Sequence, residues 1–470
     1  MPVGWLLLAS DAGAASAHLV DGWVTALFTV VLVMMILALA FEEKLHARKS
    51  IIVGTFSGIC LVLGTVINLL TFGDVTLPNG HEVNLPIYIP AIDWGVITII
   101  LGASLFVEVT SRSGVFTWMA IKLTRKSGGD PWKLLIAYGL LTVVFSAVLN
   151  NVTAMIIVGS LTSVSLKKLR RTDLLLGFLL TEGLLTNVGG LLTLISSVPN
   201  IIVGKAAGIS FGQFFVTASP FVVVATIVTL LQARWAFRVH GLRDEAEKQD
   251  AQRLVDGFDE TESITSERFF WFSIGILGLF IAALAGQSAL PWNLDKLEMG
   301  FVALFFAGVV LWVYRHEVDK FYAAVDWDLL AFFAALFVVI HTMEHARVLD
   351  MIGEGIKLVL DLPESAANAV LLSSAAVASS VTDNIPLAAM LAQILDKLGT
   401  DPDSASWWCV IFGANLGGNI TPIGSASTVV AMTIIHRNKL DCTFLGFVRK
   451  AGPFAAVQIV IATLYVMLAF

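Results

Sequence analysis

Long apolar stretches recur along the chain, and some of them are interrupted by glycine, proline and amide side chains. Most of the uninterrupted stretches approach the length of about 20 residues that an α-helix needs to cross a bilayer. They are residues 23–41, 51–72, 94–109, 211–231, 269–285, 300–314, 329–342 and 454–470. The pattern predicts an all-α polytopic membrane protein.

Two further apolar stretches have a length that fits a helical hairpin. Residues 134–166 carry no charge and are too long for one span but too short for two. Basic side chains lie at both ends, so the stretch enters and leaves on one side of the membrane. We expect a re-entrant hairpin with Asn150 and Asn151 at its tip. Residues 365–395 predict a second hairpin, with Asp383 and Asn384 near its middle.

Two segments that contain glycine pairs predict helices that break inside the membrane. They are residues 174–206 and 405–432. Non-helical backbone at that depth is tolerated only where protein or a watery cavity satisfies its polar groups, so each break is a candidate binding site. Matching residues of the two segments lie at one constant spacing: Asn187 with Asn415, Gly189 with Gly417, Gly190 with Gly418, and Thr193 with Thr421.

The two halves of the chain repeat with a spacing of their own. Asp93-Trp94 and Asn150-Asn151 recur 233 residues later as Asp326-Trp327 and Asp383-Asn384. Positive charges place the ends of the first hairpin inside and those of the second outside, which predicts the inverted repeat of a secondary transporter. We expect about 10–12 membrane segments in five parts: N-terminal spans in 1–92, a first repeat in 93–232, a linker in 233–268, connecting spans in 269–325 and a second, inverted repeat in 326–470.

Charge and composition agree with this reading. No Lys or Arg precedes the first span, which places the N-terminus outside and the linker in the cytoplasm. Hydrophobic residues make up 57% of the chain and charged residues 14%, with a mean hydropathy of +0.84, which excludes an ordinary soluble domain. Basic residues lie at membrane edges, so no nucleic-acid partner is expected. Residues 1–20 leave a cleaved signal peptide open.

The predicted solute site combines the hairpin tips with the helix breaks. Helix N-termini, free amides and hydroxyls would meet a small ion or polar solute near the middle of the bilayer. The candidate residues are Asn150, Asn151, Thr153, Asn187, Ser196, Ser197, Asn200, Asp383, Asn384, Asn415, Thr421, Ser425 and Ser427.

The candidates for carrying a coupling proton are the carboxyls of Asp383 and Glu182. Asp383 is also interpretable as a helix cap, and the tip asparagines as partners of hairpin backbone. Three widely spaced cysteines predict neither a disulfide framework nor a metal site. No cofactor is expected beyond Na⁺ or H⁺ as a coupling ion.

Five motifs resemble those of the ArsB/NhaD permease family, which includes arsenite efflux pumps, sodium/proton antiporters and the pigmentation P protein. They are SAVLNNVTAM, TNVGGLLTLISSVPN, DWDLLAFFAALF, SSVTDNIPL and GANLGGNITPIGSAS. The resemblance runs from about Phe41 to the C-terminus. It implies a permease of the cell inner membrane, a homodimer, in which rigid-body movement of hairpin and broken helix gives alternating access.

The first half departs from the cation-exchanging branch of that family. Asn150-Asn151 stands where the branch usually has Asp-Asn, SVPN at Ser197–Asn200 where it has Asp-Pro-Pro-Asn, and Arg112 where Glu is frequent. A bound cation needs negative ligands, so these losses favour an anionic or neutral oxyacid solute such as arsenite.

Three alternatives to that function remain open. Sodium/proton antiport keeps the fold and changes the solute, and a passive channel removes the coupling. The sequence HTMEH at 341–345 matches the H-x-x-E-H pattern of a class of zinc peptidases, which leaves a membrane metallopeptidase as a remote alternative.

Overall fold

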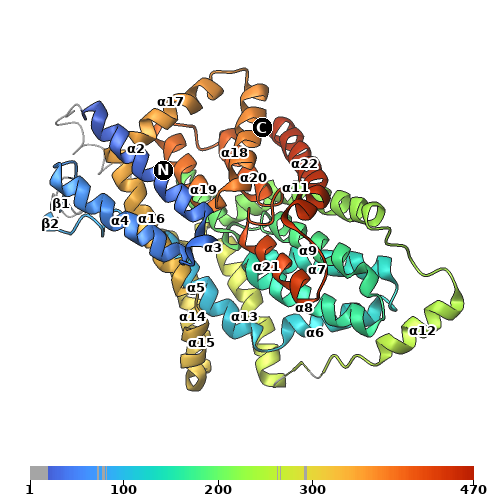
Figure 1. The fold of residues 1–470 in the computed structure, drawn as a ribbon. Coiled ribbons are helices and arrows are strands. Elements are labelled where there is room, and N and C mark those ends of the chain that lie inside the picture. The colour runs from blue at the N-terminus through green and yellow to red at the C-terminus, as the bar shows by residue number, and fades with distance from the viewer. Residues whose placement is uncertain are drawn as a thin grey trace. The chain divides into compact units, whose positions relative to one another are not determined.

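The computed structural model describes residues 20–70, 74–76, 80, 82–261, 263–264, 266–289 and 294–470. The expectation of a cleaved signal peptide concerns a segment of which 1–19 lie outside the described residues. The described chain is almost entirely helical (Figure 1), apart from the antiparallel pair β1 (Asp74–Thr76) and β2 (Glu82–Asn84). The all-α architecture predicted from the sequence is therefore confirmed. The chain divides into two compact units.

One unit joins the N-terminal helices to residues Trp327–Gly355. Its helix α16 packs along α4 and α2, and the Thr25 hydroxyl donates a hydrogen bond of 2.9 Å to the carbonyl of Ala346. A second bond runs from Ser50 to the carboxylate of Asp328. The helices are α2 (Gly22–Ala40), α3 (Glu42–Leu45), α4 (Lys49–Val66), α16 (Trp327–His345) and the first part of α17 (Val348–Leu360).

The other unit contains residues Gly95–Asp326 and Ile356–Phe470. Its α-helices in the first half are α5 (Trp94–Ser111), α6 (Val115–Lys126), α7 (Pro131–Val148), α8 (Asn151–Lys168), α9 (Leu175–Gly189), α10 (Val198–Ala206), α11 (Phe211–Ala236) and α12 (Glu245–Asp256). The later ones are α13 (Glu267–Gly286), α14 (Glu298–Val313), α15 (Val318–Ala324), α18 (Glu364–Val381), α19 (Asn384–Lys397), α20 (Ala405–Gly417), α21 (Ala426–Arg437) and α22 (Phe444–Ala469). Short 3-10 turns are η2 (Thr172–Leu174), η3 (Leu194–Ser196), η4 (Gln287–Ala289), η5 (Leu294–Leu297) and η6 (Arg315–Glu317).

Helices long and apolar enough to cross a membrane number eight among the described residues. They become nine if α14 and Arg315–Ala324, which meet at an angle of 90°, form one bent span. So many apolar helices identify a multi-pass membrane protein. The division into repeats and connecting spans stays a prediction.

Both predicted hairpins are pairs of packed helices. The first is α7 and α8, joined at Leu149-Asn150, and the second is α18 and α19, joined at Thr382-Asp383. The start of α7 follows from its sequence, because Pro131 suits the first helical position and Asp130 accepts hydrogen bonds from two backbone N–H groups. Re-entry of the hairpins into a bilayer stays a prediction.

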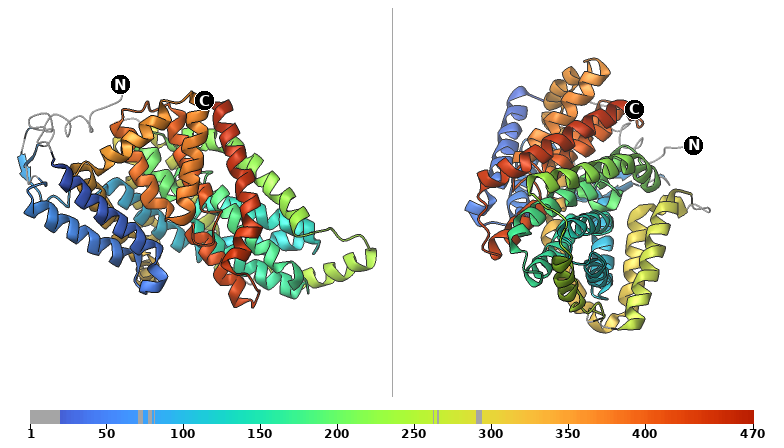
Figure 2. Two further views of the ribbon diagram at one scale, coloured as in Figure 1. Left: turned by 45° about the horizontal axis from the view of Figure 1, so that its top comes forward. Right: turned by 90° about the vertical axis from the view of Figure 1, so that its right-hand side faces the viewer.

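Each segment predicted to contain a break consists of two helices, and the depth of the break in a bilayer stays a prediction. Helix α9 ends at Gly189 and α10 begins at Val198, while α20 ends at Gly417 and α21 begins at Ala426. Helices α9 and α20 are buried along nearly their whole length and form the core of this unit. Helices α18, α20 and α22 pack side by side (Figure 2, left).

The glycines at the breaks allow the broken helices to approach the hairpins closely. A Cβ on Gly189 would lie 2.7 Å from the Cα of Val143 in α7. A Cβ on Gly417 would overlap the carbonyl oxygen of Ala376 in α18 and lie 2.7 Å from the Cβ of Ser379. Any larger residue would separate these helices.

Candidate functional site

A serine on the first helix of each hairpin is bonded to the neighbouring broken helix. The hydroxyl of Ser146 in α7 donates a hydrogen bond of 2.6 Å to the carbonyl of Thr186. The hydroxyl of Ser379 in α18 donates one of 2.6 Å to the carbonyl of Ala414. Ser379 follows Ser146 by 233 residues and Ala414 follows Thr186 by 228, which are the spacings of the tips and of the breaks.

A threonine in each break donates a second hydrogen bond, from the broken helix to the same hairpin. The hydroxyl of Thr193 donates to the carbonyl of Ala147 at 2.5 Å, and that of Thr421 donates to the carbonyl of Ser380 at 2.5 Å. These residues again match at the two spacings. Each hairpin is thus bonded to its broken helix by the same pair of hydroxyl–carbonyl contacts.

Asn187 is the centre of a buried polar network at the first break. Its Nδ2 donates to the Oδ1 of Asn419 at 2.8 Å and to the Oγ of Ser425 at 2.9 Å. Its Oδ1 accepts from the Oγ of Ser427 at 3.1 Å and from the Nδ2 of Asn151 at 3.3 Å. The side chain is 1% exposed, and it connects the start of α8 with the start of α21. The structure therefore brings four of the predicted site residues together.

Asn415 forms the corresponding centre at the second break. Its Oδ1 accepts from the Oγ of Ser197 at 2.7 Å, and its Nδ2 donates to the Oδ1 of Asn200 at 2.9 Å. The Nδ2 of Asn200 in turn donates to the carbonyl of Gly190 at 2.7 Å. These contacts bring three further predicted residues together at the start of α10.

Helix N-termini converge on both centres. Asn150 caps α8 by accepting from the N–H of Thr153 at 2.8 Å, and Ser425 caps α21 by accepting from the N–H of Thr428 at 3.3 Å. The starts of α8 and α21 lie at Asn187, and the start of α10 lies at Asn415. Free N–H groups and the helix dipoles make such N-termini favourable for anions.

The second hairpin tip carries the carboxylate of the site. Asp383 caps α19, because its Oδ1 accepts from the N–H of Ile385 at 3.1 Å. The sequence left this capping role open. The capping carboxylate lies at the hairpin tip, as the sequence predicts. Asn384 opens α19 and is half-buried, and its side chain makes no hydrogen bond within the described chain.

The remaining predicted residues contact backbone. Ser196 donates to the carbonyl of Thr193 at 2.8 Å and shapes the first break. Thr421 bonds the second break to the carbonyl of Ser380 in α18. Thr153 is half-buried, and only its backbone takes part in the cap of α8. These residues lie outside the two networks centred on Asn187 and Asn415, which we call the amide centres.

Two buried amides in the network were missing from the predicted site. Asn419, fully buried, donates to the Oε1 of Gln458 at 2.8 Å and to the carbonyl of Leu184 at 3.2 Å. Gln458 then donates to the hydroxyl of Thr229 at 2.9 Å. A signal was present for Gln458, since it is the one amide in the final apolar stretch, 454–470.

Glu182 lies deep in the core on α9. It is fully buried, and its Oε1 accepts from the hydroxyl of Thr162 at 2.5 Å. Its Oε2 has no hydrogen-bond partner among the described residues. On the neighbouring helix α7, the hydroxyl of Tyr138 is bonded to Thr124 at 2.6 Å and to Ser165 at 2.7 Å.

The histidine motif on α16 does not assemble a metal site. The rings of His341 and His345 lie 4.4 Å apart on one face of the helix. Within the described ranges, no group of three His, Cys, Asp or Glu side chains could hold a metal ion. The three cysteines, Cys60, Cys409 and Cys442, are buried and unpaired.

Comparisons with known proteins place the chain among transporters. The model of a family described as citrate transporter, CitMHS, matches residues 5–409. An uncharacterized transporter of Mycobacterium bovis is 29% identical over 386 residues, which cover 81% of this chain and 87% of that protein. The human P protein is 24% identical over 467 residues, covering 83% of this chain and 55% of that protein.

A solved structure has a similar fold. The transporter YdaH of Alcanivorax borkumensis matches with a TM-score of 0.58 and 15% identity, over 89% of this chain and 98% of that one. At that identity the similarity concerns the fold alone.

Proposed function

The chain belongs to the citrate transporter family, and from this premise we propose that it is a secondary active transporter that moves a small anion by alternating access. A role in membrane transport, and not in catalysis, follows from the family. The expected relationship to the P protein is confirmed. Membership of the ArsB/NhaD permeases, the homodimer and the inner-membrane location stay proposals.

The proposal of an anionic solute is supported by the chemistry of the two amide centres. The described side chains that form hydrogen bonds with Asn187 and Asn415 are amides and hydroxyls, and none of these is a carboxylate. The starts of α8, α10 and α21 add backbone N–H groups of partial positive charge. Such a site suits a carboxylate or oxyanion better than a bare cation. The family description makes citrate the first candidate. Arsenite, the neutral oxyacid expected from the sequence, is the second.

Alternating access is supported by the matched bonds of the two hairpins. Ser146 and Ser379 hold their broken helices through the same contact, and Thr193 and Thr421 do likewise. Each hairpin and its broken helix therefore form one packed body. Two such bodies related as inverted repeats suit a rocking motion around a central site.

Proton coupling is assigned to Glu182. An ionisable side chain inside a membrane span is a functional candidate, because burying it is costly. Glu182 forms no ion pair within the described chain, and one of its oxygens is free of hydrogen bonds there. It lies on α9, the helix that carries Asn187, so that its protonation and the solute centre act on the same helix.

Sodium/proton antiport is the second candidate function. The observation in its favour is Asp383, a carboxylate at the tip of the second hairpin. A carboxylate at that position is a suitable ligand for a cation.

A flux assay in sealed proteoliposomes distinguishes the two functions. A pH gradient is imposed, a pH-sensitive dye is enclosed, and citrate, arsenite, chloride, sodium and lithium are added in turn. We expect proton movement on addition of citrate or arsenite. Proton movement on addition of sodium or lithium alone would contradict the proposal and favour antiport. Empty liposomes serve as the control for leak.

A further inference from the structure

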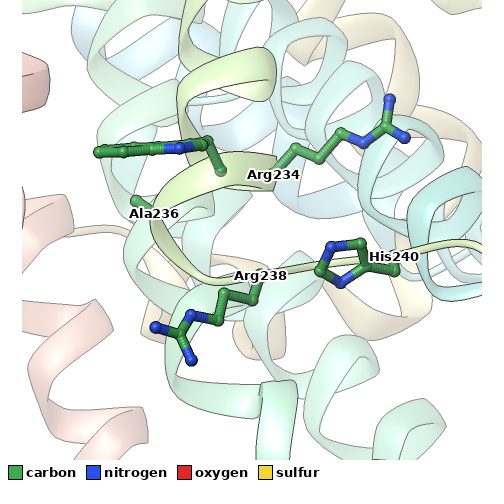
Figure 3. Close-up of a pocket in the computed structure, with 5 residues that line it drawn as sticks. Arg234, Ala236, Arg238 and His240 are labelled. Carbon is green, nitrogen blue, oxygen red and sulfur yellow. The ribbon is translucent and has the colours of Figure 1, made fainter.

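A pocket with a volume of about 420 Å³ lies where α11 ends. We call it the basic pocket, and its lining is Arg234, Trp235, Ala236, Arg238 and His240. Figure 3 shows that these residues follow the chain as it leaves the helix, with Arg238 and His240 beyond the last turn. The pocket is far along α11 from Ser210, the residue that caps the start of that helix.

Every charged side chain in the lining of the basic pocket is basic. No acid is among its lining residues. The side chains of Arg238 and His240 form no hydrogen bond or ion pair with the rest of the described chain, and Arg234 has only a cation–π contact, 4.7 Å from the ring centroid of Trp132. The nearby Asp130 already accepts hydrogen bonds from backbone N–H groups, including that of Leu242 at 2.9 Å.

The backbone of the basic pocket is held in place between anchored residues. The ring of Phe237 stacks on that of Phe454 in α22, with centroids 5.9 Å apart. Val239 is fully buried, and Leu242 is bonded to Asp130. The basic side chains alternate with these anchors and are exposed. The backbone of the basic pocket is therefore fixed, unlike that of a mobile basic tail, while the exposed side chains of Arg234 and Arg238 extend from it in different directions (Figure 3).

The surroundings indicate a membrane surface. Helix α11 is an apolar span of 26 residues, and Trp235 at its end is 84% exposed. Tryptophan is enriched where a span meets the lipid headgroups. The sequence predicts that this end faces the cytoplasm, the side on which anionic lipids give the surface a negative potential.

We propose that the basic pocket binds a phosphate group, supplied by the headgroup of an anionic lipid. Guanidinium groups bind phosphate oxygens through paired, charge-assisted hydrogen bonds. Arg234 and Arg238 are four residues apart and exposed, so their side chains can turn toward one phosphate when it binds. The ligand would contact the end of α11, which stacks on α22, beside Trp132 at the start of α7. A bound lipid thus stabilises the contact of three helices and leaves the amide centres unchanged.

Thermal unfolding of the purified full chain tests the proposal. The protein in neutral detergent is titrated with phosphatidylglycerol, with phosphatidylcholine and with inorganic phosphate. We expect phosphatidylglycerol to raise the unfolding temperature in a saturable way, and the other two to have little effect. In Arg234→Gln/Arg238→Gln, the apparent affinity for phosphatidylglycerol falls about tenfold or more, because two charge-assisted contacts are lost.

The matched control is Arg253→Gln. Arg253 lies on the exposed helix α12, where its ion pair with Asp250 is local, so the variant removes a positive charge outside the basic pocket. We expect it to bind phosphatidylglycerol as the wild type does. An equal loss in this control, or an unchanged affinity in the double variant, would overturn the site. An equal stabilisation by inorganic phosphate would overturn its assignment to a lipid.

Discussion

The amide of Asn187 in the first broken helix donates a hydrogen bond of 2.8 Å to the side-chain oxygen of Asn419 at the second break, 232 residues along the chain. Both side chains are almost completely buried. This contact joins the two halves of the chain at the centre of the candidate site.

Replacement of Asn187 by Ala should abolish solute flux. The change leaves the Oδ1 of Asn419 without its partner, at a cost of about 1–3 kcal/mol for a buried unsatisfied group. Flux in proteoliposomes is the measurement, with the unfolding temperature recorded beside it. The control is Thr433→Ala, an exposed residue of α21 that bonds only within its helix. Normal flux in Asn187→Ala would remove this residue from the site.

Asn384 provides a test of solute contact that does not disturb the fold. Its side chain makes no hydrogen bond within the described chain, so Asn384→Ala should change the free energy of unfolding by less than about 0.5 kcal/mol. If the amide binds solute, flux at low solute concentration falls by about tenfold. Wild-type flux at every concentration would show that Asn384 serves only the hairpin.

Glu182→Gln should abolish the coupling of transport to protons and leave solute exchange intact. The amide keeps the size of the side chain and accepts the bond from Thr162, but it cannot release a proton. We expect a loss of uptake driven by a pH gradient, while solute exchange at equal pH persists. Glu364→Gln is the control, since Glu364 is exposed in the first turn of α18. Gradient-driven uptake in Glu182→Gln equal to that of the wild type would exclude Glu182 as the proton carrier.

The matched serines predict a pair of equal effects. Ser146→Ala and Ser379→Ala each remove a bond of 2.6 Å from a hydroxyl to a backbone carbonyl. Each should lower the free energy of unfolding by about 1 kcal/mol. The hydroxyl oxygen of Ser146 also lies 2.6 Å from the Oδ1 of Asn151, so only Ser146→Ala should alter solute affinity in addition. Chemical denaturation and flux measure the two quantities. Equal changes in solute affinity would contradict the assignment of Asn151.

Gly417→Ala tests the close approach of α20 to α18. The added Cβ overlaps the carbonyl oxygen of Ala376, which is backbone and cannot rotate away. We expect destabilisation of about 1–3 kcal/mol, measured as a lower unfolding temperature. Gly275→Ala in α13 is the matched control, because no atom lies within 4 Å of the added Cβ. It should be neutral or slightly stabilising, since alanine favours helix.

The sequence predicted the elements of the fold better than the contacts between them. Hairpins and breaks could be located because uncharged length and glycine pairs are local signals, and the observed ends differ from the predicted ones by five residues at most. The pairing of α16 with α4 had no such signal. It depends on tertiary contacts such as that of Ser50 with Asp328, which lie 278 residues apart.

The same distinction holds for the candidate site. Asn187 and Asn415 were predicted because each stands beside a glycine pair. Gln458 was not, because it enters the network only through Asn419, 39 residues away. Ser146 lies in an apolar stretch, where a serine usually serves only to pack helices closely. Its role becomes visible only when its partner, the carbonyl of Thr186, is known.

All hydrogen-bond donors and acceptors of the Asn187 side chain are occupied by other side chains of the protein. A carboxamide offers two N–H donors and two oxygen lone pairs, and four protein side chains occupy them. An arriving solute must therefore compete with residues such as Ser425 and Asn151 for the same atoms. Binding of the solute and weakening of the hydrogen bonds between the two halves are then the same event. The solute replaces the protein's own side chains as the partner of Asn187.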